Sequence, residues 1–505
     1  MPHHVLEVRG GPDAALAARL RALRAELDVP GEFPADVLTE AERAAAEVPG
    51  RVAADPDRAD LTAVPFVTVD PAGSTDLDQA LHLQAGPGRD ELTVRYAIAD
   101  VPAFVAPEGA VDAEARRRGQ TVYLPDGRVP LHPEVLSEDA ASLLPGVERP
   151  AFVWTFVLDA EGAVASTELV RARIRSRAQL AYPQVQALLD DDAAPEAADW
   201  PVEVRASLAL LPEVGARRTA QEAARGGASL SMPDQEISVV DGAYTLVQRV
   251  PLAAEDHNAQ LSLMTGMAAA RIMLEAGVGI LRTMPAPDPA AVDAFRARTR
   301  ALGLPWGQEL DYGAYLRTVD PADPRGLAVM HAATALFRGA GYTAFDRGAE
   351  DPALRALPQD PEQAALAAPY AHTTAPLRRL VDRFVLVLCH AHVAGEPVPD
   401  WVRRALPDLP ALMAESGRRA SAADRAATDL VEAALLAARV GSVLEGTAVR
   451  TSEKGTDVQL TDPAVSLRVP GRAEPGTVVR VRVDAVDVAS GKVTASGVDW
   501  PHSAR

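Results

Sequence analysis

The sequence predicts an α+β protein in which a mixed β-sheet is followed by long helices and then by a small β-barrel. Three patterns lead to this prediction. Runs rich in β-branched and aromatic residues, such as AFVWTFVL, are separated by turn residues in residues 64–174, which is typical of strands. Alanine and leucine recur at helical spacing through much of residues 254–440, and short β segments separated by glycines fill residues 441–498. The predicted parts are residues 1–60, 61–438 and 439–505.

The composition and charge limit the classes to which the protein can belong. The formal net charge is −20, so we expect a soluble protein that does not coat nucleic-acid duplexes nonspecifically, because such coating needs a basic surface. A narrow internal path lined by arginines is compatible with this charge. The single cysteine, Cys389, permits no internal disulfide. Neither a secretory signal nor an apolar run of about 18 residues is visible, so we expect a cytoplasmic protein without a membrane segment.

Two helices are predicted before the β-rich part. Residues 12–27 have helical spacing, and a second helix is expected over residues 34–47, after a turn rich in proline and glycine. Residues 48–62 are interpreted as a linker. The leucines on one face of the first helix are Leu16, Leu20, Leu23 and Leu27. The pair could form a helix-turn-helix or could simply pack on the next domain.

The parts that follow differ in their predicted secondary structure. Strands alternate with turns through residues 64–174, residues 183–225 are predicted to be helical, and long helices follow. The C-terminal part reads as short β segments with glycine turns. Five strands would form a small barrel of the OB kind if the longest segment, residues 476–487, bends into two.

Three aspartates lie close together in the sequence DPAGSTDLDQ and form the main candidate for a metal site. Asp70, Asp76 and Asp78 have no lysine or arginine between them, and carboxylates that close repel each other unless a cation joins them. Asp76 and Asp78 fall on one side of an extended segment. Hard oxygen ligands suit Mg²⁺, with Mn²⁺ as an alternative. The other interpretation is a solvated acidic loop.

A resemblance to a known family decides between these interpretations. The segments DPAGSTDLDQAL, AIADVPAFV and RRRGQTVYLPDGRVPLHPEVLSEDAASLLPG, followed about 290 residues later by YAHTTAPLRRLVDRF, resemble the core of the ribonuclease II/R (RNB) family in order and spacing. The resemblance covers roughly residues 60–435. It implies an RNB catalytic core and a processive 3′→5′ exoribonuclease that hydrolyses single-stranded RNA to nucleoside 5′-monophosphates.

The resemblance also assigns the metal ligands. The family has four acidic positions, and three of them match Asp70, Asp76 and Asp78. The fourth is Gln79, whose amide oxygen can bind a metal ion but carries no charge. Mg²⁺ or Mn²⁺ ions at such sites commonly act in pairs, so the number of ions is open in this chain.

The segment YAHTTAPLRRLVDRF contributes the candidate phosphate-binding residues. We expect a helix to begin at Thr374, which places Arg378 and Arg379 near its first turn, where a bound anion would offset their unfavourable position. By resemblance, Arg378 holds a phosphate near the RNA 3′ end and neutralises charge in the transition state. The alternative is an ion pair between Arg378 and Asp382. His372 is a candidate RNA contact or a packed core histidine.

Other candidate RNA contacts are less specific. Alternating arginines on one strand predict a basic strip for phosphates, or only a solvated strand face. They are Arg171, Arg173, Arg175 and Arg177. Tyr182 matches a family tyrosine that stacks on RNA, with a buried core tyrosine as the alternative. Asn258, Gln260 and Asp424 lie where the family tends to have acidic residues, and we interpret Gln260 and Asp424 as substrate contacts.

The C-terminal part resembles the family, and the N-terminal part departs from it. The C-terminal barrel resembles an S1-type RNA-binding domain, but it lacks aromatic residues between Ser442 and Val498, so RNA binding there would be mainly electrostatic. About 60 helical residues precede the core, where the family usually carries cold-shock barrels. Their absence suggests a more open entrance and tolerance of structured RNA.

Three functions therefore follow from the sequence. The first is a magnesium-dependent exoribonuclease acting in RNA degradation and processing. The second is a catalytically weak or inactive RNA-binding protein on the same scaffold, favoured by Gln79. The third, a helix-turn-helix DNA-binding regulator, rests on the N-terminal helices alone. The expected partner is single-stranded RNA, with no obligatory protein partner, and the family-based expectation is a monomer.

Overall fold

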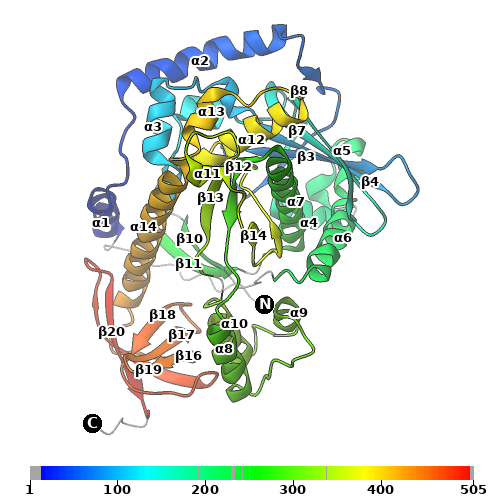
Figure 1. The fold of residues 1–505 in the computed structure, drawn as a ribbon. Helices are drawn as coiled ribbons and strands as arrows, with labels where there is room; N and C mark the ends of the chain where they lie inside the picture. The colour runs from blue at the N-terminus through cyan, green and yellow to red at the C-terminus, as the bar shows by residue number, and fades with distance from the viewer. Residues whose placement is uncertain are drawn as a thin grey trace.

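The computed structural model describes residues 13–191, 193–228, 234–240, 243–249, 251–336 and 338–500. The protein is α+β, as predicted. Figure 1 shows a twisted sheet with helices packed around it at one end and a small barrel at the other, connected by the long helix α14 (Leu409–Ala437). No helix in the described part of the chain is long and apolar enough to cross a membrane.

The central sheet has the strand order β1-β8-β7-β4-β3. Its strands are β1 (Ala59–Asp60), β3 (Gln79–Ala85), β4 (Leu92–Ala99), β7 (Glu148–Leu158) and β8 (Val164–Arg175). All neighbours pair antiparallel except β1 and β8. Phe152, Trp154 and Phe156 on β7 are fully buried, because this strand lies inside the sheet with helices on its faces.

Short strands outside this sheet position the loops that matter for function. β2 (Thr68–Asp70) pairs in parallel with β9 (Gln179–Ala181), which places Asp70 opposite Ala181. β5 (Val122–Leu124) and β6 (Gly127–Val129) form a hairpin. Three further two-stranded pairs are β10 (Asp234–Val240) with β11 (Ala243–Arg249), β12 (Val278–Thr283) with β13 (Gly341–Asp346), and β14 (Glu362–Gln363) with β15 (Ala368–Pro369).

Helices cover the sheet and extend away from it. The helices near the sheet are α3 (Ala110–Arg118), α4 (Tyr182–Asp190), α5 (Val202–Leu208), α6 (Leu211–Ala224), α7 (Ala253–Ala276), α11 (Pro352–Arg355), α12 (Leu380–Val393) and α13 (Asp400–Ala405). Short helical turns are η1 (Val101–Ala103), η2 (Val135–Ala140) and η3 (Pro195–Ala197). The prediction of helices over residues 183–225 is confirmed.

A small helical unit is inserted between β12 and β13. It consists of α8 (Pro289–Ala301), α9 (Tyr312–Arg317) and α10 (Pro324–Ala333), which enclose their own hydrophobic cluster around Phe295, Trp306 and Tyr315. Each of the three helices begins with an aspartate whose carboxylate accepts a backbone N–H in the first turn. The unit faces the barrel (Figure 1), and α10 contacts the first barrel strand.

The N-terminal helices differ from the prediction. α1 (Asp13–Glu26) agrees with it, but α2 (Ala35–Ala54) continues through Pro49, so residues 48–54 are helical and are not linker. α1 packs on α14 and the barrel, whereas α2 packs on α3 and η2 at the other end of the molecule (Figure 1). The two helices therefore contact different cores, which does not fit a helix-turn-helix pair. Their packing on the rest of the chain was the predicted alternative.

The barrel has the five strands expected, but they are divided differently. They are β16 (Val443–Ser452), β17 (Gly455–Leu460), β18 (Ser466–Val469), β19 (Val478–Asp487) and β20 (Lys492–Val498), in the order β18-β17-β16-β19-β20. The longest segment stays one strand with an irregular register after Val483, and the fifth strand is β18 instead. Trp500 lies against Gly471 and Gly497 of the barrel.

Candidate functional site

A pocket of about 590 Å³ contains the predicted carboxylate cluster. Asp70 ends β2, a loop with a glycine at positive φ (Gly73) reverses the chain, and Gln79 begins β3. The residues that line the pocket are Asp70, Pro71, Ala72, Gly73, Ser74, Asp76, Asp78, Gln79, Tyr123, Leu124, Gly127, Arg128, Tyr182 and Arg378. The pocket thus brings together the aspartates, one arginine of the segment after residue 370, and a tyrosine that follows β9.

Asp78 is the most enclosed of the three aspartates, with 3% of its surface exposed. Its Oδ1 accepts a hydrogen bond of 2.7 Å from the backbone N–H of Leu377, and its Oδ2 lies 3.5 Å from Nε of Arg378. Burial raises the pKa of Asp78 well above its ordinary value, although Arg378 and the Leu377 N–H act in the opposite direction. A bound cation would stabilise the charged form of this carboxylate.

Asp70 lies beside Tyr182 because β2 and β9 are paired. Its Oδ2 is buried and has no hydrogen-bond partner among the described residues. Burial is the main reason that the pKa of Asp70 is raised to about 7, with Asp76 raising it further and Arg378 lowering it. An unpaired, buried carboxylate oxygen is costly, and a metal ion is one partner that satisfies it.

Asp76 is paired with an arginine that was not singled out from the sequence. Arg128, on β6, makes ion pairs with Asp76 and with Glu138, the latter at 2.6 Å. Tyr123, opposite Arg128 in the hairpin, donates a hydrogen bond of 3.3 Å to Asp76. Tyr123 is 49% exposed and lines the pocket. Both residues belong to the segment VYLPDGRV, which lies within the part of the sequence that resembles the family.

Gln79 is held by hydrogen bonds on both sides of its amide. Its Nε2 donates to the backbone carbonyl of Thr374, and its Oε1 accepts a long hydrogen bond of 3.4 Å from the hydroxyl of Tyr96. Gln79 lines the same pocket as the aspartates. The atom it could offer to a metal ion is Oε1, so the Tyr96 hydrogen bond competes with that role.

The donor atoms of this pocket fit a divalent metal ion in their chemistry. Asp70 offers an unpaired buried oxygen, and the raised pKa values of Asp70 and Asp78 indicate carboxylates that lack sufficient positive charge. Asp76 is engaged by Arg128. Among the described residues, no group of three or more His, Cys, Asp or Glu side chains is gathered closely enough to form a metal site.

The segment around Arg378 folds differently from the prediction. The helix α12 begins at Leu380, with Arg379 at its N-cap position, so both arginines precede the helix. Thr374 does not cap it, because its hydroxyl lies 2.7 Å from that of Ser262 on α7. Asp382 in the first turn instead accepts the N–H of Ala375. The Asp382 side chain thereby holds the turn that carries Arg378.

The two arginines have different partners. Arg379 makes two hydrogen bonds to Asp382, at 2.7 and 3.0 Å, so the ion pair with Asp382 that was considered for Arg378 belongs to Arg379. Asp382 accordingly raises the pKa of Arg379, against the effect of burial. Arg378 is 45% exposed in its side chain, and within the described part of the chain its guanidinium makes a single ion pair, the 3.5 Å contact to Asp78. Arg378 is therefore the arginine that can reach a phosphate.

Tyr182 begins α4 and lines the pocket beside Asp70. Its hydroxyl accepts a hydrogen bond of 3.1 Å from Asn258 on α7. Gln260, two residues farther along α7, is buried and donates to Glu222 at 2.9 Å. The side-chain oxygens of Asn258 and Gln260 are buried without a hydrogen-bond partner among the described residues. Asn258 supports Tyr182, whereas Gln260 does not line the pocket.

Two further candidates lie near the pocket in different ways. Asp424, on α14, lines a second pocket of about 320 Å³ that shares Tyr123 and Arg378 with the first. His372 lines neither pocket. Its Nδ1 lies 2.7 Å from the hydroxyl of Tyr342, and burial lowers its pKa well below the ordinary value, so it is neutral at pH 7. These contacts agree with a packed histidine.

The arginine strip on β8 is neutralised by acidic residues of the protein. Arg171 binds Asp100, Arg173 binds Asp60 and Glu148, and Arg175 binds Glu148. Arg177 lies beyond the strand, which ends at Arg175, so it does not continue the strip; it donates instead to the carbonyl of Thr62. None of these four arginines lines the carboxylate pocket.

Known proteins resemble this chain in both sequence and fold. Residues 58–395 match the family described as the RNB domain, and residues 442–498 match the RNase II-type exonuclease C-terminal S1 domain. Exoribonuclease 2 of Shigella boydii is 29% identical over 426 residues, which cover 82% of this chain and 62% of that protein. The chain thus spans less than two thirds of the length of this curated relative.

Solved structures agree at the level of the fold. Mycoplasma genitalium RNase R in complex with ribose-methylated single-stranded RNA has a TM-score of 0.83 at 20% identity, covering 96% of this chain and 78% of that one. Yeast Ssd1, a pseudonuclease, has a TM-score of 0.64 at 19% identity and covers 82% of this chain and 50% of that one. Because the RNB match spans most of the sequence, as its motifs predicted, the chain belongs to the RNB family and carries a C-terminal S1 domain of the RNase II type.

Proposed function

We propose that the protein is a 3′→5′ exoribonuclease that hydrolyses single-stranded RNA processively to nucleoside 5′-monophosphates in the cytoplasm. The observation that carries this proposal is the pocket in which the buried carboxylates of Asp70 and Asp78 face the exposed guanidinium of Arg378. Membership of the RNB family supports it, since relatives include proteins named Exoribonuclease 2. A monomer without an obligatory protein partner suffices for this activity.

The residues of the pocket would have different roles in phosphodiester hydrolysis. Asp70, Asp76 and Asp78 would hold Mg²⁺ or Mn²⁺, with Gln79 as an uncharged fourth ligand. The metal, when bound, polarises the phosphate and lowers the pKa of a water molecule. Arg378 binds a phosphate oxygen and stabilises the charge that develops on it. Tyr182, held by Asn258, stacks on or contacts the terminal nucleotide.

Residues around the pocket are proposed to position its side chains or to contact other parts of the RNA. Arg379 fixes the turn that carries Arg378 through its ion pair with Asp382. Asp424 lies in the adjoining pocket, where it would contact the nucleotides that precede the 3′ end. Gln260 and His372 are proposed to act indirectly, because neither of them lines the carboxylate pocket or the pocket next to it. Arg173 and Arg175 would bind RNA only if it displaced their acidic partners.

A second candidate function is RNA binding with little or no catalysis. Gln79 favours it, because it replaces an acidic position of the family and its amide is engaged on both sides. The fold match to yeast Ssd1, a pseudonuclease, indicates that this scaffold also occurs in a protein without nuclease activity. The two functions differ in what happens to bound RNA.

One assay separates them. Single-stranded RNA labelled at its 5′ end is incubated with the protein and Mg²⁺ or Mn²⁺, and the product lengths are followed. We expect a ladder that shortens from the 3′ end and releases nucleoside 5′-monophosphates. Intact RNA that is retained in a gel shift would instead establish the second function.

Asp78→Asn tests the metal site in the same assay. The amide oxygen can still accept the Leu377 N–H, so the fold and RNA binding should be retained. Cleavage should fall at least about a hundredfold. Removing a residue that only hydrogen-bonds to a metal ligand already lowers activity by about 10–100-fold, and Asp78 is proposed as a ligand itself. Asp90→Asn, which alters an exposed ion pair with Arg89 in the turn between β3 and β4, is the control and should cleave normally. Full cleavage by the Asp78 variant would disprove the assignment.

Tolerance of structured RNA is a further part of the proposal. It is motivated by the residues described before the core, which form the helices α1 and α2. Duplexes with a short 3′ overhang should be degraded further than by a relative that carries cold-shock barrels. If both enzymes stall at the same distance from the duplex, this part of the proposal is wrong.

A further inference from the structure

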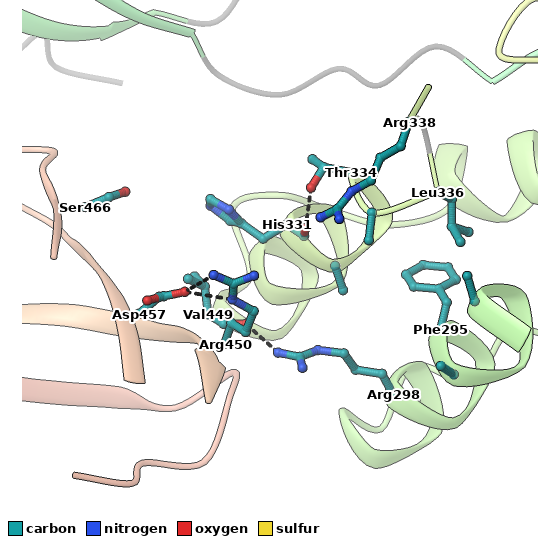
Figure 2. A pocket seen from close by; sticks show the side chains of 14 residues that line it. Phe295, Arg298, His331, Thr334, Leu336, Arg338, Val449, Arg450, Asp457 and Ser466 are labelled. Atoms are coloured by element: carbon teal, nitrogen blue, oxygen red, sulfur yellow. Dashed lines mark hydrogen bonds and ion pairs between the residues drawn. The ribbon is translucent and has the colours of Figure 1, made fainter. Parts of the chain in front are cut away.

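A second large cavity, of about 610 Å³, lies between the inserted helical unit and the barrel. Figure 2 shows α8 and α10 on one side and the strands β16–β18 on the other. The helical side is largely apolar, with Phe295, Leu336 and several alanines. The alanines that line it are Ala291, Ala294, Ala332 and Ala335. The cavity lies outside the carboxylate pocket and shares no residue with it.

Three arginines surround this apolar floor. Arg298 on α8 reaches across to the barrel, where it donates a hydrogen bond of 2.7 Å to the carbonyl of Val449 (Figure 2). Its Nε is buried and has no partner within the described part of the chain. Arg338 is exposed and makes no hydrogen bond or ion pair with another described residue. Arg450 enters from β16.

The acidic and titratable groups of the cavity do not cancel this charge. Asp457 on β17 is the one acidic residue in the lining, and it is shared between Arg450 and Arg468, at 2.7 Å from each. His331 on α10 is neutral at pH 7, because burial and Arg450 lower its pKa while Asp457 acts in the opposite direction. Arg298 and Arg338 therefore keep their positive charge without an acidic partner among the described residues, while Arg450 shares Asp457 with Arg468.

The barrel side of the cavity belongs to the face that OB folds use for oligonucleotides, which is the face of the second and third strands. In this barrel those strands are β17 and β18, which contribute Asp457 and Ser466 to the lining. The sequence from Ser442 to Val498 contains no aromatic residue, so the barrel cannot form the usual stacking surface by itself. An apolar surface is present at the same place, but it comes from α8 and α10.

We infer that this cavity binds a segment of single-stranded RNA, with phosphates at Arg298, Arg338 and Arg450 and a base against the apolar floor from α8 and α10. The inference rests on the proposed function and adds a substrate-binding site outside the catalytic pocket. Because the cavity lies on the face of the barrel that OB folds use for oligonucleotides, it suits a strand of RNA better than a free nucleotide. The helical unit thus supplies the apolar surface that the barrel lacks.

The test measures RNA affinity in EDTA, where hydrolysis is blocked, by fluorescence anisotropy at several salt concentrations. Two homopolymer RNAs are compared, one long and one just long enough to fill the catalytic pocket. Arg338→Gln should weaken binding of the long RNA several-fold and reduce the slope of log K against log salt by about one, because one phosphate contact is lost. Binding of the short RNA should not change.

A second variant tests the apolar floor without altering charge. Ala294→Trp places a large side chain in the cavity and should weaken binding of the long RNA while leaving its salt slope unchanged. Circular dichroism establishes that the variant is folded. Arg89→Gln is the matched control, since Arg89 is 95% exposed in the turn between β3 and β4, away from the barrel.

The outcomes distinguish this inference from the proposed function. Unchanged affinity and salt slope for the long RNA in both variants would overturn the cavity as an RNA site. Adenosine 5′-monophosphate that competes as well as the long RNA would mean a site for free nucleotides, which also overturns it. Failure of the wild-type protein to cleave the short RNA with Mg²⁺ would contradict the proposed activity and would leave the binding result standing.

Discussion

Arg128 makes an ion pair with Asp76, so one of the three aspartates of the pocket is neutralised by the chain itself. The guanidinium is held in place because it also binds Glu138, and Tyr123 donates to the same aspartate from the opposite strand of the hairpin. A divalent ion that uses Asp76 must therefore compete with Arg128. The hairpin β5–β6 is thus part of the candidate metal site.

Removing Arg128 should strengthen metal binding. In Arg128→Gln, Asp76 loses its ion pair and a nearby positive charge disappears, so the affinity for a divalent cation should increase. Isothermal titration of the RNA-free protein with Mn²⁺ measures this directly. Arg173→Gln, which breaks surface ion pairs of similar kind, is the control and should bind Mn²⁺ like the wild type. A weaker affinity in Arg128→Gln would mean that the arginine supports the site and does not compete with the metal.

The N-terminal helix should stabilise the same hairpin. Arg24 of α1 makes two hydrogen bonds to Asp126 in the hairpin turn, at 2.6 and 3.0 Å. Arg24→Ala should cost up to about 1 kcal/mol of local stability, as for a partly exposed ion pair. Hydrogen exchange of residues 122–129 should become faster, and the Michaelis constant for RNA should rise, because Tyr123 and Arg128 are carried by these strands.

Two controls separate this effect from general loosening of α1. Arg19→Ala removes an exposed ion pair with Glu26 on the same helix and should leave exchange of the hairpin unchanged. The exchanged pair, Arg24→Asp with Asp126→Arg, should restore protection. Equal exchange in wild type and Arg24→Ala would show that the hairpin does not depend on α1.

Buried His132 should make the protein sensitive to acid. Burial and the neighbouring Arg383 lower the pKa of His132 to about 3, from an ordinary value of 6.5. Between these values the unfolded chain binds the proton and the folded protein does not, so stability is lost as the pH falls below 6.5. At a pH of about 5 the loss from this group amounts to about 2 kcal/mol.

The measurement compares the pH dependence of unfolding in two proteins. His132→Gln keeps a side chain that can donate to the carbonyl of Pro376 but does not titrate. Denaturant unfolding between pH about 5 and about 7 should therefore show a smaller loss of stability in the variant than in the wild type. Parallel curves would mean that other groups cause the acid sensitivity.

The sequence predicted the parts of the fold whose patterns are local. The helix α1, the strands of the central sheet other than β1, and the aspartates of one loop follow from spacing and motif, whereas β1 lies in the predicted linker. Prediction from the sequence misplaced the bounds of elements that depend on contacts with residues far away in the sequence. α12 begins at Leu380 and not at Thr374, because the Thr374 hydroxyl pairs with Ser262 on α7 and Asp382 fixes the preceding turn. Neither contact is visible in the local sequence.

The candidate site shows the same division. Asp70, Asp78, Tyr182 and Arg378 were predicted and line one pocket. Arg128 was not predicted, because its place beside Asp76 depends on how the hairpin folds over the loop. The arginine strip was predicted from alternation, which fixes the strand face but does not reveal its acidic partners on neighbouring segments.

Gln79 offers the most direct test of how far this site departs from its family. Gln79→Glu has nearly the same shape, but it replaces the N–H that binds the Thr374 carbonyl with a negative oxygen. Without metal the variant should be less stable by about 1–3 kcal/mol, because two acceptors then face each other in a partly buried site. With Mn²⁺ the added charge should raise metal affinity and recover stability, so the melting temperature should rise more on adding Mn²⁺ than in the wild type. If cleavage also increases, Gln79 limits catalysis in the natural protein. If Mn²⁺ stabilises the two proteins equally, position 79 lies outside the metal site, and the three aspartates alone must account for metal binding.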